Sequence, residues 1–81
     1  MDLIWITSAK HIRDYIISLK FSDGKTGNID IRPLIEKRKS LLAPLLDINV
    51  FKNFTLNDWT ISWDDGKIDI APERLYELVA Q

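Results

Sequence analysis

One phrase of the sequence occurs twice, and it constrains the fold more than any other feature. Residues 22–36 are SDGKTGNIDIRPLIE, and residues 64–78 are DDGKIDIAPERLYEL. Each copy has an Asp-Gly turn, a stretch that ends in Ile-Asp-Ile, and a proline, which suits the first turn of a helix because N–H groups there lack helical partners. The sequence therefore predicts two pseudo-repeated units, each a β-hairpin followed by a helix. Two copies do not distinguish duplication from shared turn chemistry.

The second hairpin can be assigned a register from its turn. A two-residue turn at Asp65–Gly66 has the preferred chemistry for joining two antiparallel strands. It sets two apolar pairs opposite each other, Trp63 with Ile68 and Ile61 with Ile70. All four side chains then lie on one face, so the turn length and the apolar pattern agree. Directly upstream, NFTLND is typical of a further strand and turn.

The first hairpin follows the same logic with a longer loop. Alternation in YIISLKF predicts a half-buried strand, with Leu19 and Phe21 facing inward. If these two residues lie opposite Ile31 and Ile29, the loop has an odd number of residues, and we expect it to be Gly24–Thr26. The preceding stretch, WITSAKHIR, predicts another strand that a tight turn joins to this one.

Helical patterns follow each hairpin. In the C-terminal segment, Leu75, Leu78 and Val79 have the i, i+3, i+4 spacing of an apolar stripe that should dock on the sheet. The first helix is shorter and ends in charged residues. Between the copies, the apolar stretch SLLAPLLDINVF predicts two short turns of helix that cover the core, because Pro44 interrupts a longer helix.

Length and composition favour one ordinary globular domain. The chain has 81 residues, of which 46% are hydrophobic and 28% charged. A chain of this size buries a modest share of its surface, so we expect one core and a single domain over residues 1–81. The fold class is α+β: a small antiparallel β-sheet with two hairpin-plus-helix units and short helices packed on the sheet. Trp59, Trp63 and Phe21 fit core positions.

Cysteine content, charge and the N-terminal residues bear on location and partners. The sequence has no cysteine, which excludes a disulfide framework and a thiolate zinc site. An acidic residue stands where a secretory signal carries positive charge, and no apolar run approaches the roughly 18 residues of a membrane helix. We therefore expect a cytoplasmic protein with no membrane partner. The net charge of −1 excludes a strong global attraction to nucleic acid.

No motif of catalysis, cofactor binding or metal binding is evident. The glycines lack the spacing of a phosphate-binding loop, and His11 has no evident nucleophile or orienting carboxylate. Asp64, Asp65, Asp69 and Glu73 are close in sequence but do not follow the order of a calcium loop. A turn, an outward-facing strand position and the first turn of a helix account for them. We expect no enzyme, no cofactor and no metal site.

A basic stretch is the best argument for a nucleic-acid partner. Arg32, Lys37, Arg38 and Lys39 lie close together in the sequence, where they can neutralise phosphates at a helix end. Basic residues in the last turn of a helix also complement the helix dipole, which explains them without a ligand. Both interpretations stay open at this point.

The N-terminal strand carries apolar residues on both faces. A small core covers one face of this strand, so part of the apolar surface of Ile4, Trp5 and Ile6 should stay uncovered. These three residues are therefore candidate contacts for a small protein partner or a homodimer. The alternative is that a helix covers one face and the sheet the other. Edge strands of a small sheet also offer unpaired backbone groups to a partner's strand.

Three segments of the chain, DYIISLKFSDGKTGNIDIRPLI, LAPLLDINVFKNF and ISWDDGKIDIAPERLY, together resemble a small bacterial family, domain of unknown function 2442. The resemblance runs from about Asp14 to Leu78. Its signatures are the FSDG turn, PLLD followed by Phe51, and the segment from Trp63 to Tyr76. It implies a compact α+β fold on antiparallel strands in a bacterial, cytoplasmic protein, with no established activity or catalytic residues.

The resemblance also implies a kind of partner. Members of that family are often encoded beside another small protein, an arrangement similar to toxin–antitoxin pairs, and some carry an added helix-turn-helix that these 81 residues do not contain. We therefore expect a non-enzymatic protein-interaction module, the antitoxin-like member of a toxin–antitoxin-type pair. The alternative is a nucleic-acid-binding domain that uses the basic stretch from Arg32 to Lys39.

Overall fold

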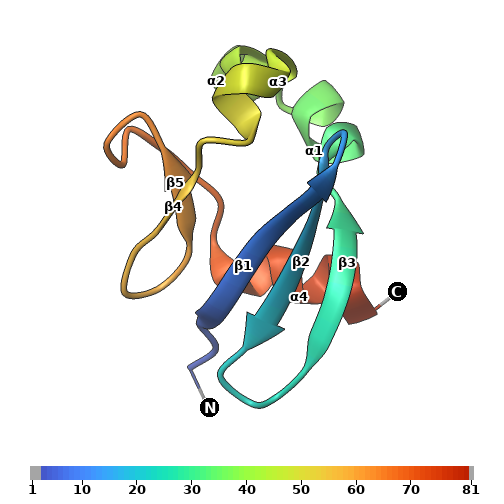
Figure 1. Cartoon of the computed structure of the whole chain (residues 1–81), viewed down its shortest axis with the longest axis vertical. Coiled ribbons are helices and arrows are strands. Elements are labelled where there is room, and N and C mark those ends of the chain that lie inside the picture. Colours follow the sequence, from blue (N-terminus) through green and yellow to red (C-terminus); the bar gives the residue numbers. More distant parts are fainter. Residues whose placement is uncertain (1–2, 81) are drawn as a thin grey trace.

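Two three-stranded antiparallel sheets and several short helices make up the molecule (Figure 1). The computed structural model describes residues 3–80. The first sheet has the order β1-β2-β3 and consists of β1 (Ile6–Arg13), β2 (Ile16–Phe21) and β3 (Thr26–Asp30). The second has the order β4-β5-β6 and consists of β4 (Thr55–Leu56), β5 (Ile61–Trp63) and β6 (Ile68–Asp69). The predicted α+β class is confirmed, with the strands divided between two sheets.

A helix follows each sheet along the chain. These helices are α1 (Arg32–Lys37) and α4 (Pro72–Ala80), and each has a proline in its first turn, as predicted. The connection between the units consists of α2 (Lys39–Leu42), the 3-10 turn η1 (Ala43–Leu46) and α3 (Ile48–Phe51). The chain therefore forms two β-β-β-α units, and the repeated phrase supplies the last turn, the last strand and most of the helix of each. None of the helices within residues 3–80 is long and apolar enough to cross a membrane.

The predicted register of the second hairpin is confirmed. Trp63 lies opposite Ile68. The turn between them has positive φ at Asp64 (54°), Asp65 (56°) and Gly66 (88°). Positive φ at successive turn residues matches the right-handed twist of the two strands, so a short connection closes without splaying them.

The predicted register of the first hairpin is wrong. Ile29 lies opposite Ile17 rather than Phe21, and the loop is Ser22–Gly24 rather than Gly24–Thr26. The shift involves an even number of residues, so Ile17 and Ile29 still face the core and are buried. Apolar alternation determines the inward face of this strand but not its position along its neighbour.

Turn chemistry explains the shift. The N–H of Phe21 donates to the carbonyl of Lys25 at 2.8 Å, which closes a three-residue loop. Gly24 ends that loop at φ = 92°, a conformation that costs glycine little, and the Asp23 carboxylate accepts the N–H of Lys25 at 2.9 Å. A three-residue loop that ends in a residue of positive φ is a common hairpin connection.

Helix α4 belongs to the second unit but packs on the sheet of the first. It crosses that sheet in Figure 1 and contacts β3. The packing is close at Gly27, because a Cβ atom there would lie 2.7 Å from Cγ1 of Val79. The predicted stripe is confirmed, since Leu75 is buried and Leu78 and Val79 are half-buried against the core. The helix of the second unit therefore packs on the sheet of the first unit and joins the two units.

Tyr76 attaches α4 to the turn of the first hairpin. Its hydroxyl donates to Oδ2 of Asp23 at 2.7 Å, and its ring lies edge-on to Phe21 with centroids 5.1 Å apart. The ammonium group of Lys25 lies 4.7 Å from the centre of the same ring. The hydrogen bond from Tyr76 is the largest cause that lowers the pKa of Asp23 below its ordinary value, and the bond from the N–H of Lys25 is the next largest. The same bond to Asp23 raises the pKa of the Tyr76 hydroxyl.

Tyr76→Phe is expected to raise the pKa of Asp23 toward its ordinary value, because it removes the largest cause of the lowering. NMR titration of the Asp23 carboxyl group measures this change. The pKa of Asp23 is lower in the folded protein than in the unfolded chain, where it is about 3.9. Ionised Asp23 therefore stabilises the fold above the unfolded pKa, and this stabilisation is lost as the pH falls through the folded pKa. Wild-type protein should therefore lose more stability in acid than the variant does.

Tyr15→Phe is the matched control for this titration. The Tyr15 hydroxyl donates to the carbonyl of Leu46, away from Asp23, so this variant should leave the pKa of Asp23 unchanged. Equal pKa changes in the two variants would show that the Tyr76 hydrogen bond is not the cause.

One hydrophobic core joins the two sheets and the helices. Its largest fully buried side chains are Trp63, Phe21 and Phe51, so the predicted core positions of Trp63 and Phe21 are confirmed. The indole N–H of Trp63 donates to the carbonyl of Phe51 at 2.7 Å, and the two rings stack with centroids 5.8 Å apart. The hydroxyl of Thr60 donates to the carbonyl of Ile70 at 2.6 Å. The buried polar groups of Trp63 and Thr60 therefore each have a partner.

Candidate functional site

The three predicted partner contacts at the N-terminus lie in different environments. Ile6 is buried, Ile4 is half-buried against the core, and Trp5 is 38% exposed. The side chain of Ile6 therefore serves the core and is not available to a partner. Trp5 is the residue of this group that offers an apolar surface to solvent.

Trp59 is a second exposed tryptophan, and its predicted core position is wrong. It is 53% exposed, because β5 begins only at Ile61 although the alternation of WTISW extends further upstream. The side-chain oxygen of Asn57 accepts the N–H groups of Trp59 at 2.7 Å and Thr60 at 2.8 Å, which folds this segment into a turn. The Asn-Asp pair directly before Trp59 is the sequence signal of that turn.

The two exposed tryptophans contact each other. The rings of Trp5 and Trp59 meet edge to face, with centroids 6.1 Å apart and an interplanar angle of 86°. Their backbones are held as well, because Ile6 donates its N–H to the carbonyl of Trp59 and Ser22 donates to the carbonyl of Trp5, each at 2.8 Å. The same two segments also expose two leucines. We define the aromatic face as the exposed side chains of Trp5 and Trp59.

Two of the four residues in the predicted basic stretch share one carboxylate. Arg32 Nε and Lys39 Nζ lie 3.5 and 3.1 Å from the carboxylate oxygens of Glu36. The hydrogen bond from Lys39 is the largest cause that lowers the pKa of Glu36. Arg32 also lies over the ring of Tyr15, 5.3 Å from its centre, while Lys37 is exposed at the end of α1. The stretch therefore does not present four free cations to a phosphate backbone.

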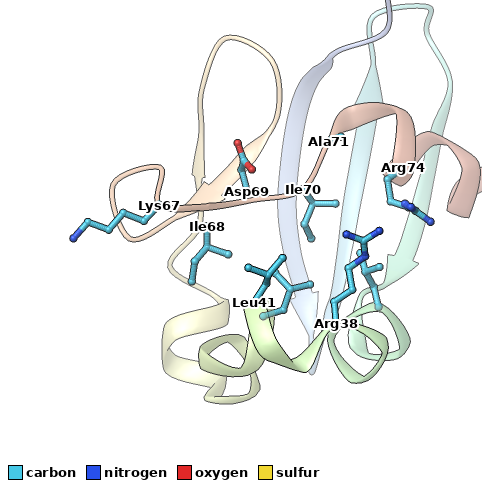
Figure 2. A pocket seen from close by; sticks show the side chains of 10 residues that line it. Arg38, Leu41, Lys67, Ile68, Asp69, Ile70, Ala71 and Arg74 are labelled. Atoms are coloured by element: carbon cyan, nitrogen blue, oxygen red, sulfur yellow. The ribbon is translucent and has the colours of Figure 1, made fainter.

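Arg38, the remaining residue of that stretch, lines a groove together with residues of the second unit. The groove has a volume of about 340 Å³ and lies between the α1–α2 region and the segment from β6 to α4 (Figure 2). Its charged lining residues are Arg38, Lys67, Asp69 and Arg74. We call it the basic groove. Its residues come from distant parts of the chain, so no sequence motif marks it.

Residues suited to catalysis or metal binding do not gather in the described structure. His11 places Nε2 2.8 Å from the backbone carbonyl oxygen of Asp14, and its ring lies edge-on to Phe51. Over residues 3–80, no three His, Asp or Glu side chains lie together in a way that could hold a metal ion. The four acidic residues considered for a metal site are all exposed: Asp64, Asp65, Asp69 and Glu73.

Comparison with known proteins identifies one family. The family described as "Protein of unknown function (DUF2442)" matches residues 6–81, nearly the whole chain. No significant match was found among curated proteins or solved structures. The match confirms the resemblance carried by the two hairpin-plus-helix segments and the PLLD segment between them. This chain therefore belongs to the DUF2442 family of proteins of unknown function.

Proposed function

We propose that this protein is a non-enzymatic protein-interaction module whose aromatic face binds another small protein. One observation carries the proposal: Trp5 and Trp59 stay 38% and 53% exposed in a domain small enough to need its large apolar side chains inside. Tryptophan is enriched among the residues that contribute most to protein–protein binding. Exposed apolar residues that gather in one place are a recognised mark of such a surface.

The way the two rings are held supports the same proposal. The carbonyl groups of both tryptophans accept backbone hydrogen bonds, and Asn57 fixes the turn that carries Trp59. The rings also pack against each other before any partner arrives. A surface that is ordered in advance loses little conformational entropy on binding, so more of the contact energy contributes to affinity.

We further propose that the protein acts as the antitoxin-like member of a toxin–antitoxin-type pair in the bacterial cytoplasm. Membership of the DUF2442 family supports this, because the resemblance implies a gene beside that of another small protein. The absence of cysteine suits a reducing compartment. A homodimer formed through the same face is the competing arrangement.

Nucleic-acid binding through the basic stretch has weaker support. Counterion release from a phosphate backbone needs several free cations, and Glu36 already engages Arg32 and Lys39. No observation on the described residues favours this function over protein binding, so the aromatic face remains the stronger basis for a proposal.

Tagged protein purified from its native host is expected to carry one stoichiometric small partner, and the Trp5→Ser/Trp59→Ser double variant is expected to lose it. A tryptophan at the centre of an interface contributes about 2 kcal/mol or more, which is about 30-fold in affinity. The two rings touch, so their joint effect should be less than the sum of the single effects. Mass spectrometry identifies the partner, and calorimetry on the purified complex measures the affinity.

Ile12→Ser is the matched control for this experiment. Ile12 is 40% exposed and lies near the other end of β1, so its replacement removes a similar apolar surface away from the aromatic face. Far-UV circular dichroism checks that all variants are folded. Monomeric wild-type protein without a partner would contradict the proposal, as would equal partner loss in all variants. If the wild-type protein is a homodimer and the double variant is a monomer, the aromatic face binds a second copy of the chain. That result would support the face as an interface but overturn the antitoxin-like role.

A further inference from the structure

The basic groove brings together side chains from both units of the fold. Arg38 and Leu41 come from the α1–α2 region, and Arg74 comes from α4. Figure 2 shows the segment around β6 running along the groove. Because β6 is an edge strand of its sheet, the groove lies beside backbone groups that a further strand can pair with.

Two arginines give one end of the groove its positive charge. Arg38 and Arg74 both line it, and Figure 2 shows their guanidinium groups at the same end, while the charged groups of Lys67 and Asp69 point elsewhere. Among the described residues neither arginine makes an ion pair, whereas the nearby Glu36 is shared by two other basic residues. Guanidinium groups without a counter-charge form a site for a planar anion such as a carboxylate.

The middle of the groove is apolar. Leu41 is 65% exposed, although it is a large aliphatic residue, and Figure 2 shows it in the middle of the groove. Ile68 is half-buried, and Leu34, Leu42 and Ile70 are buried beneath. An apolar surface next to a pair of cations fits a ligand that carries an apolar group and an anionic group within a short distance.

We propose that the basic groove binds an extended acidic peptide segment of the protein partner. A Glu or Asp side chain of that segment lies between Arg38 and Arg74, and a neighbouring apolar side chain packs on Leu41. Pairing of the segment with the edge of β6 supplies backbone hydrogen bonds, while its side chains supply specificity. This inference rests on the proposed function and names the chemistry of a second contact with the same partner.

The lining of the groove favours a peptide over a nucleic acid. A phosphate backbone calls for a track of several cations, and bases of a single strand stack on aromatic side chains. The described lining residues instead supply two arginines at one end, an apolar middle and no aromatic ring.

Fluorescence anisotropy with labelled short peptides that alternate Glu and Leu tests the inference on the whole chain. We expect binding that weakens with added salt and falls about tenfold or more when Gln replaces Glu in the peptide, because charge-assisted hydrogen bonds are lost. Arg38→Gln and Arg74→Gln should each weaken binding by about the same factor. Arg13→Gln is the matched control, since Arg13 is an exposed arginine at the end of β1, and it should bind as wild type does.

Each of three results would overturn the inference. The first is equal binding of the Glu and Gln peptides, the second is unchanged affinity in both arginine variants, and the third is tighter binding of a short single-stranded oligonucleotide at the same arginines. Co-purification from the host separates the inference from the proposed function. Partner loss in the folded Arg38→Gln/Arg74→Gln variant supports the inference. Retention by that variant, with loss in Trp5→Ser/Trp59→Ser, overturns the inference and leaves the proposed function standing.

Discussion

Replacement of Trp63 by alanine is expected to lower the free energy of unfolding by about 3–5 kcal/mol. Trp63 is 1% exposed, stacks on Phe51 and donates its indole N–H to the carbonyl of that residue. Alanine removes the buried ring and also leaves a buried carbonyl group without its donor. A domain of 81 residues has a total stability of about 4–12 kcal/mol, so this loss is a large share of the total.

Two further variants separate the causes of this loss. Trp63→Phe keeps an aromatic ring but removes the hydrogen bond, so it should cost less, about 1–3 kcal/mol. Trp59→Ala removes an equally large side chain from the surface and should cost less than about 1 kcal/mol. Urea unfolding followed by far-UV circular dichroism measures all three, since tryptophan fluorescence changes with the substitutions themselves. A loss in Trp59→Ala as large as that in Trp63→Ala would contradict this account of the core.

Gly27→Ala is expected to destabilise the protein by about 1–3 kcal/mol. An alanine in a strand is ordinarily better than a glycine, because glycine loses more conformational freedom on folding. Here the new Cβ atom would lie 2.7 Å from Cγ1 of Val79, and valine is a stiff side chain that cannot move away at the χ1 bond alone. The sign of the effect therefore depends on the packing of α4 against β3.

A double-mutant cycle with Val79→Ala tests that dependence. Val79→Ala removes the methyl group that the added Cβ would meet, so Gly27→Ala should become neutral or stabilising in that background. Urea unfolding of the four proteins gives the coupling energy between the two sites. Strictly additive effects would show that α4 does not pack on the first sheet at this position.

Much of the fold follows from local chemistry that the sequence displays. In the second hairpin, Asp65–Gly66 and the apolar pairs require the same register, and the structure has it. In the first hairpin, a shift by an even number of residues keeps Ile29 facing inward, so the apolar pattern does not choose between registers. The loop that ends at Gly24 makes the choice.

The candidate sites are harder to predict because tertiary contacts create them. Alternation places Trp59 in the core, but hydrogen bonds to the Asn57 side chain keep that segment out of β5. Trp5 then acquires an exposed neighbour that lies far away in the sequence. The basic groove likewise needs Arg38 and Arg74 in one place, which happens only because α4 of the second unit packs across the first.

Amide hydrogen exchange on the complex purified from the native host tests the central claim, that the aromatic face binds a partner protein. The account predicts slower exchange over residues 3–6 and 56–60 in the complex than in the free protein, because a partner on this face shields the backbone next to both tryptophans. An occupied basic groove would add protection over residues 67–74. Unchanged exchange in both segments of the aromatic face, with protection confined to other parts of the chain, would contradict the claim.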